Sequence, residues 1–398
     1  MRVLFLHPNF PGQFVNPARG MAKSGHDVRF LCQTHYGRTI QKVRRLCLKG
    51  ELGDEELKKQ AKGQFQTGQV MSEQYLRGML KIKQEHWHPD VVISHSGWGC
   101  GLHVKELWPN CRHISYLEWW FNPQSDLLTF DPDNSQLGLG PKSIHKLWKR
   151  NQALALELIC ADKIVAPSKW QKSQLPMSLQ KQCAVIFDGV DIQIFQPNQN
   201  FVSNVPLITY GTRGMEPIRC FPEFINELPY ILKRWKDIKV EIAGNDEINY
   251  CGQKPDEGSW GKWAIQKLEP WIKSGRVKFV GRLNQEKYVQ WLQSSWCHVY
   301  LTQPFVCSWS LLESLSCGCH LIASDLEVVR EFRNYGEFSL VDTRKSGFLR
   351  GPVQTLLSKG QPTAAQLVGR AQRLEPISRT TALKDWLDVA GVNLAATG

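Results

Sequence analysis

The segment from Pro304 to Asp325 combines the residue types that a phosphate-and-ribose pocket requires. Its sequence, PFVCSWSLLESLSCGCHLIASD, predicts a strand end, a tight loop, a short helix, a glycine turn and a second strand. The start of such a helix offers unpaired backbone N–H groups and a positive dipole end, which suit a phosphate. One helical turn further on, the Glu313 carboxylate can accept hydrogen bonds from a ribose. The segment therefore predicts a nucleotide-sugar pocket.

Cations at other predicted strand ends suit the diphosphate of such a ligand. Arg213 and Arg219 follow the predicted strand 207–210, where two guanidinium groups can clamp a diphosphate. Arg282 ends the strand 277–280 and is a candidate third cation. Gly244 ends the strand 239–243, where it can line the base or ribose pocket.

Three strand ends in the first half of the chain carry candidates for sugar binding. Gly12 lies in the Pro/Gly loop after the first strand, where it permits close backbone approach. His95 and Trp98 lie in the glycine-rich loop HSGWGCG, which suits a flat sugar surface. Glu118 and Trp119 follow the strand 113–117, where the ring can stack on a sugar and the carboxylate can bind hydroxyls or move a proton. Structural roles in turns or in an aromatic cluster are the alternatives at each position.

Strands alternate with helices along the whole chain, which predicts parallel sheets covered by helices on both faces. A polar segment at 198–204 separates two such series. We therefore expect two doubly wound α/β domains at 1–197 and 198–375, and a C-terminal helical segment at 376–398 that packs back on the first domain. Within the first domain, 36–86 reads as a mostly helical insertion and 143–160 as one helix. Ligands in such sheets bind beyond the carboxyl ends of the strands, so the cleft between the two domains is the expected site.

The composition is that of a folded protein without membrane-spanning segments. The 398 residues have a net charge of +12, and no apolar run approaches the roughly 20 residues that cross a bilayer. The apolar start MRVLFLHPNFPG predicts a buried strand instead of a signal peptide, and the twelve scattered cysteines indicate reduced thiols. We expect a cytoplasmic protein. No metal-ligand spacing and no nucleic-acid-binding motif is evident, so neither a metal nor a nucleic-acid partner is expected.

A basic segment, Lys142–Arg150, allows two interpretations. It contains Ile144, Leu147 and Trp148 among its charges. Its apolar side either packs inward, which leaves a solvated basic face, or lies on an anionic membrane surface at the inner face of the membrane.

Together these motifs resemble retaining GT-B glycosyltransferases of family 4. The resemblance rests on the opening MRVLFLHPNFPGQF with GHDV at 25–28, on APSKWQ at 166–171, on DGVD at 188–191, on FVGR at 279–282 and on the segment around Glu313. It covers nearly the whole chain, and the order and spacing of the motifs make it specific.

The resemblance implies two facing Rossmann-like domains that bind acceptor and nucleotide-sugar donor, respectively, without a metal or other cofactor. A sugar would pass from a UDP- or GDP-linked donor to a hydroxyl of a carbohydrate, lipid-linked or protein acceptor. Glu313 matches the second glutamate of the family's E-x7-E motif, which binds the donor ribose. Arg213 matches the arginine that holds the donor phosphates, and Arg219 lies one residue beyond the usual place of its lysine partner.

Two departures from the family pattern leave alternatives open. Phe305 stands where the first motif glutamate belongs, so groups around Val306, Ser308, Ser310 and Leu311 must hold the donor sugar. Glu118 stands where the family often has a histidine. The alternatives are a catalytically inactive GT-B-like binding or scaffold protein and a GT-B nucleotide-sugar epimerase.

Overall fold

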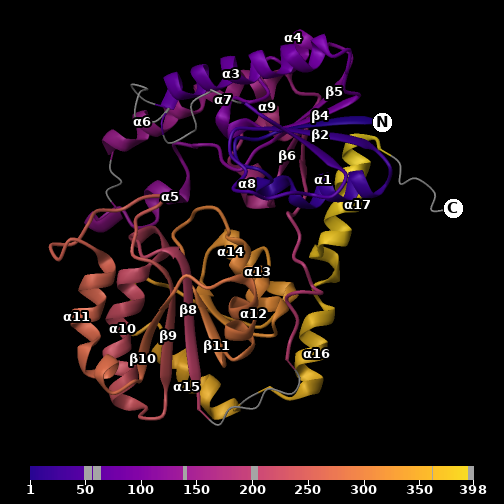
Figure 1. The fold of residues 1–398 in the computed structure, drawn as a ribbon. Helices are drawn as coiled ribbons and strands as arrows, with labels where there is room; N and C mark the ends of the chain where they lie inside the picture. The colour runs from indigo at the N-terminus through magenta and orange to yellow at the C-terminus, as the bar shows by residue number, and fades with distance from the viewer. Residues whose placement is uncertain (49–55, 57–63, 138–140, 199–204, 361, 393–398) are drawn as a thin grey trace. The chain divides into compact units, whose positions relative to one another are not determined.

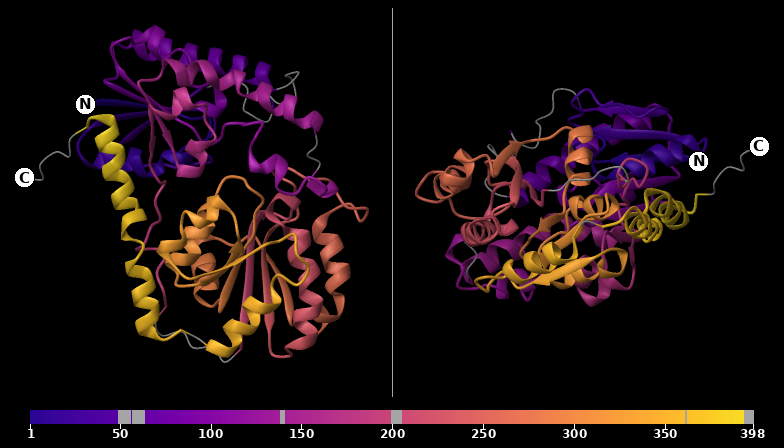
Figure 2. Two further views of the ribbon diagram at one scale, coloured as in Figure 1. Left: turned by 180° about the vertical axis from the view of Figure 1, so that it is seen from behind. Right: turned by 90° about the horizontal axis from the view of Figure 1, so that it is seen from below.

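The computed structural model describes residues 1–48, 56, 64–137, 141–198, 205–360 and 362–392. The chain forms two compact units, drawn in Figures 1 and 2. Unit 1 contains Met1–Pro123, Ser143–Gly189 and Arg379–Gly398, and unit 2 contains Gln124–Lys142 and Val190–Ser378. The chain thus enters unit 2 twice, at Gln124 and at Val190, and returns to unit 1 for its C-terminal helix.

Unit 1 is built on a seven-stranded parallel sheet in the order β3-β2-β1-β4-β5-β6-β7. Its strands are β1 (Arg2–Leu6), β2 (Asp27–Cys32), β3 (Val43–Cys47), β4 (Val91–His95), β5 (Arg112–Tyr116), β6 (Lys163–Ala166) and β7 (Cys183–Val185). Its helices are η1 (Gly12–Phe14), α1 (Val15–Lys23), α3 (Gln64–Gln84), η2 (Ser96–Trp98), α4 (Val104–Leu107), α6 (Pro141–Arg150), α7 (Gln152–Cys160), α8 (Lys169–Ser173), α9 (Met177–Gln180) and α17 (Arg379–Ala390).

Alternate side chains of β1 explain why helices cover both faces of this sheet. Val3 and Phe5 pack with residues of α1 and α17, whereas Leu4 and Leu6 pack with residues of α3 and α4. Because successive side chains of a strand point to opposite faces, an uninterrupted apolar run requires a cover on each side.

One local expectation from the sequence is incomplete and another is wrong. The segment 36–86 contains a strand, β3, besides α3, and β3 pairs in parallel with β2 at the edge of the sheet. The pair Arg44-Arg45 breaks its apolar pattern, as an edge position allows. The segment 143–160 contains two helices, α6 and α7. They separate at Asn151, whose side-chain amide makes two hydrogen bonds, at 3.0 and 2.9 Å, with the backbone of Phe121.

Unit 2 has a six-stranded parallel sheet in the order β10-β9-β8-β11-β12-β13. Its strands are β8 (Leu207–Gly214), β9 (Lys239–Asn245), β10 (Val277–Gly281), β11 (Cys297–Tyr300), β12 (His320–Ser324) and β13 (Phe338–Val341). Its helices are α5 (Asp126–Thr129), η3 (Ser135–Leu137), η4 (Pro217–Arg219), α10 (Phe221–Arg234), α11 (Trp260–Lys273), α12 (Gln285–Gln293), α13 (Trp309–Ser316), α14 (Glu327–Arg330), η5 (Arg333–Tyr335), α15 (Arg350–Lys359), α16 (Ala364–Gln372) and η6 (Glu375–Ile377).

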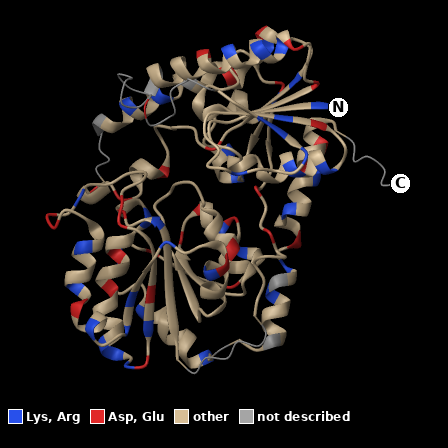
Figure 3. Ribbon diagram, in the orientation of Figure 1, with Lys and Arg blue, Asp and Glu red and all other residues tan. Residues whose placement is uncertain are grey.

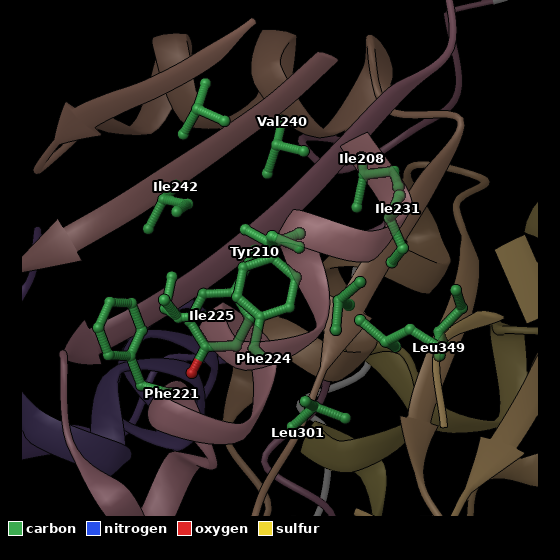
Figure 4. Close-up of a cluster of buried hydrophobic side chains, with 14 of the residues drawn as sticks. Ile208, Tyr210, Phe221, Phe224, Ile225, Ile231, Val240, Ile242, Leu301 and Leu349 are labelled. Atoms are coloured by element: carbon green, nitrogen blue, oxygen red, sulfur yellow. The ribbon is translucent and has the colours of Figure 1, made fainter. Parts of the chain in front are cut away.

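The core of unit 2 lies between β8, β9 and α10 (Figure 4). Tyr210 of β8 stacks on Phe224 of α10 with ring centroids 4.5 Å apart, and both rings are fully buried. The phenolic hydroxyl of Tyr210 donates to the backbone oxygen of Arg219 at 2.8 Å. The core therefore fixes the backbone of the loop that follows β8.

Both sheets have a point where the strand order reverses. In unit 1 it lies between β1 and β4, and in unit 2 between β8 and β11. Loops that leave the carboxyl ends of these neighbouring strands diverge, which opens a crevice where ligands bind in doubly wound folds. The residues that follow β1, β4, β8 and β11 are therefore the first place to look for a site.

Candidate active site

Arg219 is a buried cation at the switch point of unit 2. Its side chain is only 7% exposed, and its Nη1 donates to Thr302 Oγ1 at 3.0 Å and to the Val306 carbonyl at 3.2 Å. Both acceptors are uncharged, and within the described ranges no carboxylate forms an ion pair with Arg219. Burial disfavours the charged guanidinium, but the surrounding acidic groups, the Tyr300 phenol foremost, raise the pKa of Arg219 above its usual value. The site thus holds a permanent positive charge.

Glu216, three residues earlier, holds the loop that follows β9. Its Oε2 accepts the backbone N–H groups of Asn249 at 3.0 Å, Tyr250 at 2.8 Å and Cys251 at 3.3 Å. Burial raises the pKa of this carboxyl, and the N–H groups of Tyr250 and Cys251 oppose the rise. Glu216 therefore orders a loop beside Arg219, a role that the sequence did not predict.

The loop before α13 already uses one of the N–H groups that the sequence offered to a phosphate. The backbone N–H of Ser308 donates to the hydroxyl of Tyr300 at 2.8 Å, and the hydroxyls of Ser308 and Ser310 lie 2.6 Å apart. Leu311 is fully buried, and its backbone N–H already donates to the Ser308 carbonyl at 3.2 Å. Ser308 can therefore contact a bound ligand through its hydroxyl instead of its N–H.

Glu313 lies in α13 and is half-buried. The Tyr288 hydroxyl of α12 lies within hydrogen-bonding reach of its carboxylate, and burial together with this carboxylate raises the pKa of Tyr288. The Tyr288 ring is stacked on Trp291 with centroids 6.0 Å apart. Tyr288, which the sequence did not single out, therefore helps to orient Glu313.

The remaining donor-side residues occupy strand ends in unit 2. Arg213 lies in β8 and Arg282 follows β10, and both side chains are exposed. Gly244 of β9 has φ +138°, and a Cβ there would lie 2.1 Å from the Thr212 carbonyl oxygen. The backbone here is too close to β8 for any other residue. Arg219 and Val306 are thus in direct contact, whereas Arg213 and Arg282 extend from the surface.

Two histidine rings meet at the switch point of unit 1. His7, directly after β1, and His95, the last residue of β4, have centroids 4.9 Å apart. His7 Nδ1 accepts the Asn9 N–H at 2.9 Å, which leaves His7 Nε2 to donate to Gln13 at 2.9 Å. Burial, followed by the neighbouring His95, lowers the pKa of His7 well below its usual value. His7 is therefore a neutral ring that supports His95, and its position at a strand end was a signal in the sequence.

His95 connects this pair to Glu118. Its Nδ1 accepts the Gly97 N–H at 3.2 Å, so its Nε2 carries the proton and lies 3.4 Å from Glu118 Oε2. Trp98 of η2 is half-buried, with its ring 6.4 Å from that of His95. Trp119 packs on Trp170 at 5.3 Å. His95, Trp98 and Glu118 therefore form one group, whereas the Trp119 ring belongs to an adjacent aromatic cluster.

Gly12 is packed against the histidine pair. It has φ +52°, and a Cβ there would lie 2.6 Å from His7 Nε2. Only glycine permits this close approach of η1 to the ring.

A fully buried carboxylate, Glu157, supports the same strand ends from α7. Its Oε1 accepts the hydroxyls of Ser94 at 2.6 Å and Ser115 at 2.8 Å, and its Oε2 accepts the Gly101 N–H at 3.0 Å. Burial raises its pKa above the usual value. It ties β4, β5 and the loop after β4 together. A lone acid within the apolar run ALALELIC was the signal that could have revealed it.

Substitution of His7 should change how stability depends on pH. The unfolded imidazole takes up a proton as the pH falls through about 6.5, whereas the buried ring does not, so acid stabilises the unfolded state. Between pH 6.5 and 5.5 the wild-type protein should lose about 1 kcal/mol more unfolding free energy than His7→Gln. Urea denaturation at both pH values measures this, and equal losses in the two proteins would contradict a neutral His7.

Lys and Arg side chains are spread over both units, and residues of α6 are among them (Figure 3). In the residues that the structure describes, no cluster of three or more His, Cys, Asp or Glu side chains could hold a metal ion. None of the helices searched in those residues has the length and apolar character to cross a bilayer.

Comparison with known proteins identifies the fold. Residues 24–195 match the glycosyl transferase family 4 group. No curated protein matches the chain by sequence. Over 98% of this chain and 97% of the other, the fold is similar to the sucrose-phosphate synthase of Thermosynechococcus elongatus, with TM-score 0.68 and 13% identity.

Two further solved structures have a similar fold. Anabaena HepE in complex with UDP-glucose gives TM-score 0.67 at 13% identity, over 98% of this chain and 99% of that one. The catalytic domain of Arabidopsis thaliana starch synthase IV, bound to ADP and acarbose, gives 0.65 at 10% identity over 98% of each chain. The fold is therefore that of GT-B glycosyltransferases, and the family match supports a glycosyltransferase.

Proposed function

We propose that this protein transfers a sugar from a UDP- or GDP-linked donor to an acceptor hydroxyl, with retention of anomeric configuration. The observation that carries the proposal is the buried Arg219 guanidinium at the switch point of unit 2, whose bonded partners are neutral. Glu216 and the nearby phenols offset part of the cost of burying this charge, but no carboxylate of the described residues forms an ion pair with it, and a bound diphosphate would supply one. HepE was solved with UDP-glucose bound and starch synthase IV with ADP and acarbose bound, and these ligands support a nucleoside-diphosphate donor.

In this proposal the donor occupies the strand ends of unit 2. Arg219, with the exposed Arg213, neutralises the diphosphate as it leaves, which lowers the barrier without a metal ion. Glu313 accepts the ribose hydroxyls. Gly244 and Arg282 border the nucleoside.

The remaining groups bind the phosphates and the acceptor. The loop and first turn of α13 hold the phosphates and the sugar through donors of Val306, Ser308 and Ser310, with the buried Leu311 supporting the turn, and Gly12 permits close backbone approach to a phosphate or sugar.

The acceptor binds to unit 1. The His95, Trp98 and Glu118 group provides a ring surface and a carboxylate, and Trp119 extends the surface. Glu118, held 3.4 Å from His95 Nε2, receives a hydrogen bond from the acceptor hydroxyl and orients it for attack.

A panel of UDP- and GDP-sugars tests this function. The account predicts that at least one donor releases its nucleoside diphosphate in the presence of the protein. Proton NMR of the transferred sugar would then give the anomeric configuration. If no donor either binds or turns over, the proposal is wrong.

We also propose that the acceptor-side unit contacts an anionic membrane surface through α6 and α7. Trp148 of α6 is 48% exposed, and Leu156 and Ile159 of α7 are 56% and 62% exposed. The exposed Lys146 and Lys149 lie in α6 with Trp148. Exposed apolar side chains beside lysines suit an anionic interface. Flotation should show binding to vesicles that contain phosphatidylglycerol, and weaker binding for Trp148→Ser. If vesicles of neutral lipid bind the protein equally well, electrostatic attraction to the membrane is not involved and that part of the proposal is wrong.

A further inference from the structure

Two aromatic rings border the Arg219 guanidinium. The Tyr250 ring centroid lies 5.4 Å and the Phe305 ring centroid 5.8 Å from the central carbon of the guanidinium. The two rings lie 5.4 Å apart at an interplanar angle of 62°. They therefore form a corner next to the buried cation.

The backbone on both sides of this corner is fixed. On the Tyr250 side, Glu216 accepts three consecutive N–H groups, and the Cys251 thiol donates to the Leu137 carbonyl at 3.1 Å. On the Phe305 side, the next residue, Val306, accepts a hydrogen bond from Arg219. The Tyr250 ring is nevertheless 44% exposed. An exposed ring on a fixed loop presents a surface that loses little conformational freedom when it binds a ligand.

The C–H groups of a sugar can pack on the faces of both rings, which are apolar. The nearby carboxylate of Glu216 cannot serve the sugar hydroxyls, because its Oε2 accepts three backbone N–H groups and its Oε1 is buried. Aromatic faces attract C–H groups and cations, whereas a carboxylate attracts hydroxyls. A sugar whose diphosphate is bound by Arg219 would therefore contact the rings of Tyr250 and Phe305.

From this arrangement, and resting on the proposed function, we infer that Tyr250 and Phe305 bind the transferred sugar by stacking on a C–H face of its ring. The ligand class is a neutral hexose of a nucleoside-diphosphate donor. Tyr250 is then a specificity residue of the donor site. With Phe305 in place of the motif glutamate, the sugar is recognised by stacking instead of by hydrogen bonds to its hydroxyls.

Calorimetric titration of paired ligands tests this inference. UDP-glucose is compared with UDP, and GDP-mannose with GDP, so that the ratio of the two dissociation constants isolates the sugar contact. For the pair that binds, Phe305→Leu and Tyr250→Leu should each reduce the affinity advantage of the sugar nucleotide about three- to tenfold. Leucine keeps an apolar side chain of similar bulk, so the variants should fold, and circular dichroism checks this.

Tyr230→Leu is the matched control. Tyr230 is also 44% exposed and also lies beside an arginine, with the central guanidinium carbon of Arg350 4.0 Å from its ring centroid. It should leave the ratio unchanged. If the wild-type protein binds the sugar nucleotides but both Leu variants keep the wild-type ratio, the inference is wrong and the proposed function stands. If the wild-type protein binds none of the four ligands, the proposed function itself fails.

Discussion

Replacing Arg219 by methionine should reduce sugar transfer about 100- to 1,000-fold, the range found when one pre-organised donor to a developing negative charge is removed. The protein should stay folded, because methionine fills the buried space of the side chain and only the hydrogen bonds to Thr302 and Val306 are lost. A buried acceptor left unpaired in this way lowers the unfolding free energy by about 1–3 kcal/mol. Steady-state release of nucleoside diphosphate and thermal unfolding measure the two effects.

Arg219→Lys is the control for charge alone. It retains the positive charge but not the planar fork that can bond Thr302, Val306 and a phosphate together, so its activity should lie between those of the wild-type protein and Arg219→Met. A methionine variant that unfolds at a much lower temperature would show that Arg219 is a structural residue. A methionine variant with full activity would remove it from the donor site.

Glu313→Ala should weaken nucleotide binding about 10- to 150-fold, because a hydrogen bond to a charged group contributes about 1.5–3 kcal/mol. The loss should depend on the ribose hydroxyls. Wild-type protein should bind UDP more tightly than 2′,3′-dideoxy-UDP by a similar factor, and the variant should bind both alike. Calorimetric titration of the two nucleotides measures this.

Glu313→Gln keeps the shape and one acceptor oxygen, so it should retain part of the discrimination. The Tyr288 hydroxyl within reach of the carboxylate is a second donor to the same group. If Glu313→Ala still distinguishes UDP from the dideoxy nucleotide, the ribose is bound by other residues and the assignment of Glu313 is wrong.

The alternation of strands and helices could be predicted from the sequence because buried parallel strands are continuous apolar runs, such as those at 3–6 and 321–323. The prediction failed where a tertiary contact decides the local structure. β3 forms because β2 offers it an edge in spite of its two arginines. The break at Asn151 exists because Phe121, thirty residues away, binds its side chain.

Only part of the candidate site could be predicted from the sequence, again because tertiary contacts decide the rest. Strand-end positions for Arg219, His95 and Glu118 follow from the topology. Which arginine is buried does not, because it depends on Thr302 and Val306 of a distant loop. In the sequence Glu216 looks like any surface acid, because its role depends on hydrogen bonds from the distant loop at 249–251.

We propose above all that unit 2 contains a nucleoside-diphosphate site centred on Arg219. Isothermal titration of UDP and GDP into the intact protein and into Arg219→Met tests it most directly. We expect saturable binding of at least one nucleotide by the wild-type protein, with one ligand per chain, and a severe loss of affinity in the variant. Failure of the wild-type protein to bind either nucleotide, or equal affinity of the variant, would contradict it.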